Sequence, residues 1–366
     1  MTTHSNFCRK LTEMLKNVAY FIGLTFLFTA CGDSETIHYK QEKHLTNVKQ
    51  LTNGDDNAEA YWNFKSDALV FQTNRKDWGF ECDQICYFPL SDGDMLTKQP
   101  QLISTGKGRT TCSYFLPGDS LIIYASTHLG GENCPPEPER SKDKYVWPIY
   151  ETFDIFVADL EGNIVAQLTD EPGYDAEPTV SPDGTKIVFT STRSGDLELY
   201  TMNIDGSDVQ QVTHGLGYDG GAFFSPDSKK LVFRSSRPKT DEEIEKYKSL
   251  LADGVVEPSD MEIYTCNIDG SDLKQVTDLG RANWAPFYHP SGKKILFSSN
   301  HASILPWKFN LFMIDENGEN LEQVTFDETF DAFPMFSPDG KKLVFSSNRN
   351  NGGTRATNIF IADWID

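Results

Sequence analysis

The sequence predicts an all-β protein, a six-bladed β-propeller whose ring is closed by a strand from the N-terminal side of the repeats. Two kinds of short motif recur, and each occurs six times. One is a turn typified by Ser-Pro-Asp-Gly between two apolar runs, and the other is a Leu-Thr, Val-Thr or Ile-Ser pair that ends a unit. Repeats of about 40–50 residues are typical of propellers. The turns lie at 65–68, 116–119, 181–184, 225–228, 289–292 and 337–340, and the pairs end at Thr52, Ser104, Thr169, Thr213, Thr277 and Thr325.

The clearest repeat, residues 176–213, is predicted to form four short strands. Pro182 presets φ for its first turn, and Gly184 tolerates the positive φ that follows. The next run, KIVFTST, is rich in β-branched and aromatic residues, as strands are. The run LELYTMNI predicts a third strand, Asp205 and Gly206 turn the chain, and VQQVT forms a short outer strand.

The two motif series are offset along the chain. The first closing pair precedes the first turn, and no closing pair follows the last turn. A closed ring explains this offset if residues 45–52 supply the outer strand of the last sheet, beside residues 358–364. Closure of this kind leaves no free edge between the first and last blades.

Two units are longer than four short strands require, and both insertions fall between the second and third strands. They are residues 127–154 in the second blade and 237–260 in the fourth blade. In the fourth blade, Thr240 and Glu243 form a capping box before a helical apolar pattern. The pattern predicts one short helix at 241–252 over the ring.

The N-terminal 30 residues have the features of a secretory signal and lie outside the fold. A basic start precedes the apolar stretch 18–30, which is shorter than the roughly 20 residues of a membrane span. The stretch ends in FTAC, which resembles a bacterial lipobox and implies cleavage before Cys31 and acylation of its thiol. An ordinary signal peptide followed by a coincidental Cys is the alternative. Residues 31–44 are polar and are expected as a flexible tether to the propeller domain, residues 45–366.

Seven cysteines occur, and five remain after Cys8 leaves with the signal and Cys31 is acylated. An oxidising compartment makes one or two disulfides plausible, although spacing alone does not give their pairing. Cys112 and Cys134 flank one strand pair and are the first expected bridge. Cys266 lies in a predicted strand and is expected as a buried free thiol.

The formal net charge of −21 makes nucleic acid an unsuitable partner, because an acidic surface repels phosphate backbones. With the lipobox, these features predict an outer-membrane lipoprotein that faces the periplasm or the cell surface. A closed ring presents no obvious sheet edge for pairing, so we expect a monomer.

The repeat SPDGTKIVFTSTRSGDLELYTMNIDGSDVQQVT at 181–213 resembles the repeat of TolB-type six-bladed propellers. Similar blades occur in TolB, in the propellers of prolyl oligopeptidases and in oligogalacturonate lyases, so the resemblance implies the fold and not one function. TolB carries an additional α/β domain before its propeller, for which only residues 32–44 remain here. The peptidases use a G-x-S-x-G nucleophile elbow, which this sequence lacks.

Two sets of loops are expected to surround one mouth of the central channel, which is the expected binding site. Loops that enter the innermost strands contain the aromatic-acid pairs ending at Asp175, Asp219 and Asp331. These carboxylates are candidates for binding cations or sugar hydroxyls. The alternative is a structural role in blade packing and backbone capping.

Loops between the second and third strands begin with basic or amide residues. His and Arg converging on the mouth are candidates for binding an acidic glycan or a peptide carboxylate, and the alternative is pairing of each Arg with an Asp of the neighbouring blade. Three histidines are also candidates for a divalent metal, the one cofactor considered, with ordinary polar contacts as the alternative. The ligand candidates from these loops are His128, Arg193, His301 and Arg349, and Arg281 and Asn283 join them from an entering loop. The metal candidates are His128, His301 and His214, of which His214 begins an entering loop.

Two functions are consistent with these features. The first is a non-catalytic lipoprotein that binds a protein or glycan partner through its loop face, and a complete ring without a catalytic domain favours it. The second is a carbohydrate-active enzyme of the polyuronate lyase kind, with Arg neutralising the uronate carboxylate and His acting as the base. The sequence does not establish catalysis.

Overall fold

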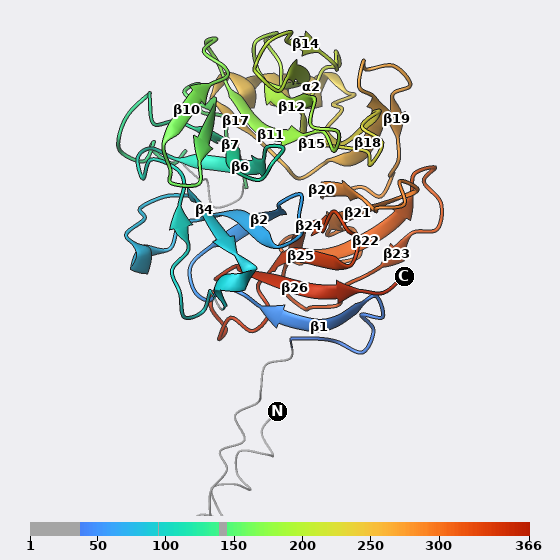
Figure 1. The fold of residues 1–366 in the computed structure, drawn as a ribbon. Helices are drawn as coiled ribbons and strands as arrows, with labels where there is room; N and C mark the ends of the chain where they lie inside the picture. Colours follow the sequence, from blue (N-terminus) through green and yellow to red (C-terminus); the bar gives the residue numbers. More distant parts are fainter. Residues whose placement is uncertain (1–36, 94, 139–144) are drawn as a thin grey trace, which may run out of the picture. The chain divides into compact units, whose positions relative to one another are not determined.

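The computed structural model describes residues 37–93, 95–138 and 145–366, which form a six-bladed propeller (Figure 1). Each blade is a four-stranded antiparallel sheet, and the blades are numbered 1 to 6 in chain order of their innermost strands. From the innermost strand outwards, the blades are as follows. Blade 1 is β2 (Asn57–Trp62), β3 (Ala68–Thr73), β4 (Gln84–Pro89) and β5 (Gln101–Leu102); blade 2 is β6 (Thr110–Phe115), β7 (Leu121–Ser126), β9 (Asp154–Asp159) and β10 (Ile164–Gln167). Blade 3 is β11 (Asp175–Val180), β12 (Lys186–Ser191), β13 (Glu198–Asn203) and β14 (Gln210–Gln211); blade 4 is β15 (Asp219–Phe224), β16 (Lys230–Ser235), β18 (Glu262–Asn267) and β19 (Lys274–Gln275). Blade 5 is β20 (Asn283–Tyr288), β21 (Lys294–Ser299), β22 (Asn310–Asp315) and β23 (Glu322–Gln323); blade 6 is β24 (Asp331–Phe336), β25 (Lys342–Ser347), β26 (Asn358–Trp364) and β1 (Leu45–Gln50).

The predicted closure of the ring is confirmed. Strand β1 pairs antiparallel with β26, with Leu45 opposite Trp364 and Gln50 opposite Phe360. In Figure 1 the blue strand β1 lies against the red strand β26 at the edge of the same sheet. The start and the end of the propeller are therefore neighbours in blade 6.

The closing pairs that mark each repeat have a shared structural role. Their hydroxyl accepts a hydrogen bond from the N–H of the second residue of the third strand, as Thr213 does from Leu199 at 2.9 Å. The outer strands are mostly two residues long, so this hydroxyl supplies a bond where the backbone ladder ends. The six accepting residues are Thr52, Ser104, Thr169, Thr213, Thr277 and Thr325.

An aromatic residue occupies the same buried place in the second strand of every blade. Each lies four positions into its strand and is fully buried between neighbouring sheets, where large rings bury the most apolar area. This repeated ring supplies much of the core between blades. The six residues are Phe71, Tyr124, Phe189, Phe233, Phe297 and Phe345.

The helix predicted at 241–252 is confirmed as α2 (Asp241–Ala252), with the capping box between Thr240 and Glu243 present. The two insertions meet above the ring. Strand β8 (Trp147–Pro148) from blade 2 pairs antiparallel with β17 (Val255–Val256), which follows α2 in blade 4. We call residues 145–150 with β17 the roof, because residues 145–150 line the cavity at the channel. Two short 3₁₀ helices, η1 (Lys76–Trp78) and η2 (Leu90–Asp92), complete the described elements.

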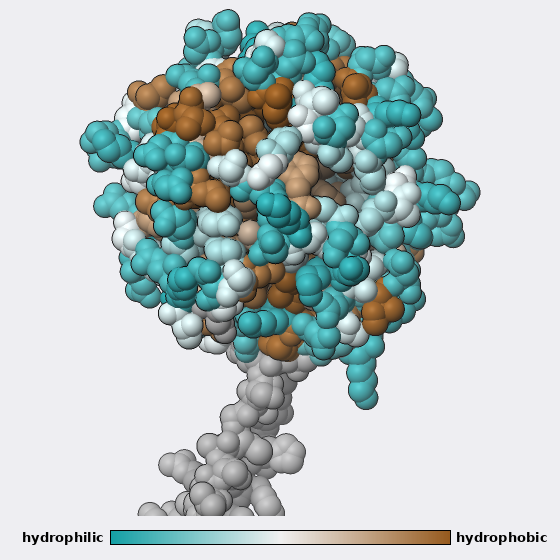
Figure 2. Space-filling model, viewed as in Figure 1, coloured by the Kyte–Doolittle hydropathy of each residue, from teal (hydrophilic) through white to brown (hydrophobic). Residues whose placement is uncertain are grey.

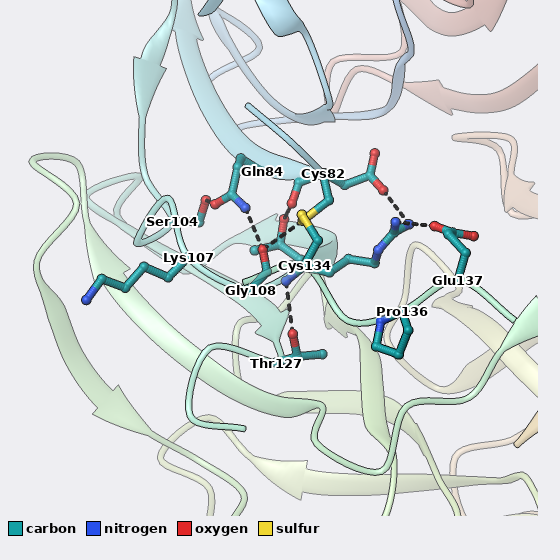
Figure 3. Close-up of a disulfide and its surroundings, with 12 residues drawn as sticks. Cys82, Gln84, Ser104, Lys107, Gly108, Thr127, Cys134, Pro136 and Glu137 are labelled. Atoms are coloured by element: carbon teal, nitrogen blue, oxygen red, sulfur yellow. Dashed lines mark hydrogen bonds and ion pairs between the residues drawn. A yellow bond between two sulfur atoms is a disulfide. The ribbon is translucent and has the colours of Figure 1, made fainter. Parts of the chain in front are cut away.

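The disulfide predicted between Cys112 and Cys134 is wrong. Cys134 pairs with Cys82, so the bridge joins the blade 2 insertion to the corresponding loop of blade 1 (Figure 3). Cys112 cannot take this place because it lies on β6 with its Sγ 2.9 Å from a carboxylate oxygen of Glu59. Cys266 is a buried free thiol, as expected.

Residues 37–44, expected as part of a flexible tether, pack against the propeller instead. The side chain of Glu42 is fully buried and pairs with Arg349 at 2.9 Å, while the same guanidinium binds Asp331 at 2.7 Å. Tyr39 donates a hydrogen bond to Asp327 at 2.7 Å. Burial lowers the stability of a lone charge, so each member of this triad depends on the others.

We expect Arg349→Met to destabilise the propeller by roughly 3–5 kcal/mol, because Glu42 and Asp331 would be left buried without a cation. Urea unfolding followed by fluorescence measures the change. The control is Arg281→Met, which replaces an exposed arginine. Equal stability of the two variants would show that the triad does not hold blade 6.

Candidate functional site

The innermost strand of every blade has a bulge at its third residue. All six of these residues have positive φ, between 42° and 59°, and the strand pairing shifts register around each of them. A bulge re-aims the side chain at its site. All six third residues line one cavity at the channel; they are Glu59, Cys112, Glu177, Gly221, Ala285 and Phe333.

The cavity has a volume of about 490 Å³ and lies under the roof. Its aromatic lining comes from the innermost strands, from the residues directly before three of them, from the residue before β9 and from the roof. The indole of Trp147 lies 5.1 Å from that of Trp284, measured between ring centroids, and Tyr145 lies 6.4 Å from Trp284. The aromatic lining residues are Tyr61, Tyr145, Trp147, Tyr150, Phe153, Tyr174, Tyr218, Phe223, Trp284, Phe330 and Phe333.

A buried ion pair crosses from blade 3 to blade 4 within the cavity. Arg234 pairs with Glu177, and its guanidinium lies 5.0 Å from the rings of both Trp147 and Tyr218. Glu177 also accepts hydrogen bonds from Thr190 at 2.7 Å and from the Gly221 N–H at 2.8 Å. Burial alone would raise the pKa of Glu177, but Arg234 and these donors outweigh it and lower the pKa.

Gly221 is required for this arrangement. A Cβ at this position would lie 1.8 Å from Nη1 of Arg234, so any other residue would collide with the guanidinium. The missing side chain therefore leaves the space that the guanidinium of Arg234 occupies.

A second carboxyl, on blade 1, has a different environment. Glu59 accepts hydrogen bonds from Tyr61 at 3.1 Å and from Cys112 at 2.9 Å. Burial is the main cause that raises its pKa, and the charge of Glu177 adds to the effect. Burial likewise raises the pKa of the Cys112 thiol well above its usual value. Of these two carboxyls, Glu177 is thus stabilised as the anion and Glu59 as the acid.

The rim next to blade 1 is held by the disulfide and an ion-pair cluster. Arg109 donates to Asp83 at 3.0 Å and pairs with Glu137 from the blade 2 insertion. Figure 3 shows Glu137 and Pro136 on the same loop segment as Cys134. The bridge and the ion pairs fasten the start of this insertion to the ring.

The acids and arginines predicted from the repeats lie outside the cavity lining. The structural alternative, pairing with an Asp of the neighbouring blade, is wrong in its partner, because each acid pairs with an arginine of its own blade. The pairs are Asp175 with Arg193 at 2.8 Å, Asp219 with Arg237 at 2.7 Å, and Asp331 with Arg349 at 2.7 Å. Burial raises the pKa of all three carboxyls, which their arginines partly offset. The structure thus places these side chains at strand ends, where they connect the first and second strands of one blade.

The histidines contact their own blades. His128 lies 2.9 Å from the hydroxyl of Ser126 and packs on Phe156, while His301 repeats this arrangement with Ser299 at 2.8 Å and Phe312. Burial lowers the pKa of both imidazoles. His214 is exposed. Within residues 37–93, 95–138 and 145–366, no group of three or more His, Cys, Asp or Glu side chains is arranged to hold a metal ion.

The two remaining candidates come from one loop of blade 5. Arg281 is exposed, with a positive φ of 62°. Asn283 is buried and donates to the carbonyl of Met261 at 2.8 Å, while its side-chain oxygen accepts from Ser299 at 2.6 Å. Asn283 therefore takes the place that Asp has in blades 3, 4 and 6.

The comparisons with known proteins agree with the fold. Residues 149–255 match the family described as the TolB beta propeller domain. Among curated proteins, none matches the sequence. The class of protein that fold and repeat define is a TolB-like six-bladed β-propeller.

Solved structures extend this likeness over most of the chain. A putative TolB from Agrobacterium tumefaciens matches with 20% identity and a TM-score of 0.56, covering 85% of this chain and 91% of that one. TolB from Acinetobacter baumannii matches with 20% identity and a TM-score of 0.50, over 85% of this chain but only 64% of that one, less than two thirds of its length. An oligogalacturonate lyase in complex with manganese matches with 14% identity and a TM-score of 0.50, over 87% and 80%. At these identities the likeness shows the fold alone.

We expect Glu59→Gln to increase stability at higher pH. Above pH 4.5, the usual pKa of a Glu side chain, the unfolded chain releases the proton of Glu59 while the folded protein still holds it. The free energy of unfolding therefore falls as the pH rises. Unfolding midpoints in urea between about pH 4 and about pH 8 measure the effect. The unfolding midpoint of the variant should equal that of the wild type at the acidic end of this range and exceed it at the basic end.

The control for this titration is Glu245→Gln, which removes an exposed carboxylate from α2. A pH-independent difference between wild type and Glu59→Gln would contradict the burial effect.

Proposed function

We propose that this protein is a membrane-anchored binding module that takes a glycan into the roofed cavity at its channel mouth. The observation that carries the proposal is the cavity itself, which combines aromatic faces with polar groups under one roof. Its volume of about 490 Å³ lies in the range of small-ligand sites.

The lining suits the two surfaces of a sugar ring. The apolar faces of sugars pack on aromatic rings, and Tyr145 and Trp284 offer such faces beside Trp147. Sugar hydroxyls need hydrogen-bond acceptors and donors, which Glu59, Gln72 and other polar lining residues supply. This pairing of chemistries favours a glycan over an extended peptide strand.

The charge of the lining favours a glycan without carboxylates. Among the described lining residues the cations are Arg109 and Arg234, and each is already paired with carboxylates. The acids are Asp56, Glu59, Asp83, Glu137 and Glu177. A neutral or amine-bearing saccharide therefore fits better than a polyuronate.

The alternative, a polyuronate lyase, has its support in the fold shared with the oligogalacturonate lyase. That mechanism requires a base and a free guanidinium at the substrate. No histidine occurs among the described lining residues, and the guanidinium of Arg234 is held by Glu177 and Tyr218. Binding without cleavage is thus the better supported reading of the cavity.

The anchor completes the proposal. Cys31, expected to be acylated, lies outside the described residues, and the lipobox supports an outer-membrane location facing the periplasm or the cell surface. In the part of the chain that the structure describes, no helix has the length and apolar character to cross a bilayer.

We expect Trp147→Ala to weaken glycan binding at least about fivefold, because an aromatic face worth about 1–3 kcal/mol is removed from the roof. Calorimetry with a panel of neutral, amino-sugar and uronate oligosaccharides measures the affinity. Trp307→Ala is the control, since Trp307 is exposed and lies outside the cavity lining.

The same panel separates the alternatives. Unsaturated, ultraviolet-absorbing product from a polyuronate would establish the lyase, and capture of a protein with no affinity for any glycan would replace the glycan with a protein partner. Equal glycan affinity of the wild type and Trp147→Ala would place binding elsewhere.

We expect Cys31→Ser to move the protein from the membrane fraction to the soluble fraction, because the acyl chains supply the membrane affinity. Fractionation followed by mass analysis of the N-terminal peptide measures both location and acylation. Retention of the variant in membranes would contradict an anchor at Cys31.

A further inference from the structure

The loop between β21 and β22 of blade 5 presents an apolar tip to solvent. Ile304 is 88% exposed, Trp307 63% and Leu305 38%. No charged residue occurs between Ala302 and Trp307. Exposed apolar side chains gathered in this way mark interaction sites more often than single ones do. We call Ile304, Leu305 and Trp307 the apolar tip.

The loop is ordered by its own hydrogen bonds. Ser303 donates its N–H to the carbonyl of Asn300 at 3.0 Å, and the Asn300 side chain donates to the carbonyl of Pro306 at 2.9 Å. The N–H of Leu305 is bound by the Ser303 hydroxyl at 3.0 Å. The apolar tip is therefore held outwards by a defined backbone.

The corresponding loops of other blades differ. In blade 1, Trp78 is partly covered by Arg75, whose guanidinium lies 4.6 Å from the ring, and by Phe80. The loops at 192–197 and 348–357 are largely polar. The blade 2 insertion also exposes Leu129 and Tyr145, at 61% and 56%, but they are 16 residues apart, whereas blade 5 gathers three exposed apolar side chains within four residues.

The apolar tip lies close to the point where the N-terminal segment joins the propeller. Both flank the connection 326–330 between blades 5 and 6. On one side, Lys308 at the end of the loop pairs with Glu328 at 2.6 Å. On the other, Tyr39 donates to Asp327 and Glu42 accepts from the N–H of Phe326 at 3.2 Å.

The chain between Cys31 and Ile37 is short. Six residue steps span at most about 20 Å when fully extended. An acyl anchor at Cys31 therefore restricts this edge of the propeller to the neighbourhood of the lipid surface.

We propose that the apolar tip contacts the lipid surface beside the acyl anchor and fixes which edge of the propeller faces the membrane. This inference rests on the proposed acylation of Cys31. Trp favours the membrane interface, where its ring is amphipathic, and Ile304 and Leu305 bury apolar area in the same layer.

The acyl chains supply the affinity, so the apolar tip acts on orientation. The protein carries a net charge of −21, and Glu328 beside the loop is exposed, so electrostatic attraction to anionic lipids is absent as a driving force. Zwitterionic lipid is therefore sufficient for the contact.

The experiment places an environment-sensitive nitrobenzoxadiazole label at Ile304→Cys in the acylated protein, reconstituted in phosphatidylethanolamine–phosphatidylcholine vesicles. Labelled Leu129→Cys is the matched control, because Leu129 is 61% exposed in the corresponding loop of blade 2, across the ring. Cys86 and Cys266 are buried, and the acylated protein without an introduced Cys, treated with the same label, measures any labelling of Cys112. We expect the emission of the label at position 304 to shift to the blue on membrane binding, and Trp307→Ser to reduce this shift. We expect no shift for the label at position 129.

Flotation of the vesicles separates the two proposals. Flotation without an emission shift at position 304 supports the anchor but overturns the contact of the apolar tip with lipid. An equal shift at positions 304 and 129 also overturns that contact. Failure of the acylated protein to float overturns both. A shift at 304 that appears only after a protein partner is added would assign the apolar tip to that partner and overturn lipid contact.

Discussion

The pairing of β1 with β26 is the constraint on which the structure depends. It places the beginning and the end of the propeller in one sheet, so that six blades close around one channel. The buried triad of Glu42, Arg349 and Asp331 fastens the same junction from the side. Without closure, the innermost strands of blades 1 and 6 would not face one another, and the cavity would have no common wall.

The bulge at the third residue of each innermost strand converts this ring into a site. One backbone conformation, repeated six times, presents six residues to the same space, five of them with a side chain. Blades 1–3 contribute Glu59, Cys112 and Glu177, while blades 4–6 contribute a glycine, an alanine and a phenylalanine at these positions. The scaffold is therefore symmetric in its backbone, but the chemistry of the cavity is asymmetric.

Repetition in this sequence marks structure more than function. The acids Asp175, Asp219 and Asp331 recur because each binds an arginine at the end of a neighbouring strand in its own blade. Among the cavity residues, Tyr174, Tyr218 and Phe330 belong to the repeated aromatic-acid pairs. The side chains at the bulges vary from blade to blade, and no repeated pattern singles them out. Arg234 illustrates this difference. Of the six residues at the equivalent position of the second strands, it alone is an arginine, and it alone lies beside a glycine at the bulge.

Local signals in the sequence determined the six blades, the closing strand and α2. Turn chemistry, β-branched runs and a capping box act over a few residues, so they can be read without tertiary contacts. The bulges, the Cys82–Cys134 bridge and the ion pair of Glu177 with Arg234 were decided by the tertiary structure. The bulges depend on the pairing of two strands within a blade, and the bridge and the ion pair join residues from different blades. Their common cavity exists only once the ring has closed and the insertions have met above the channel.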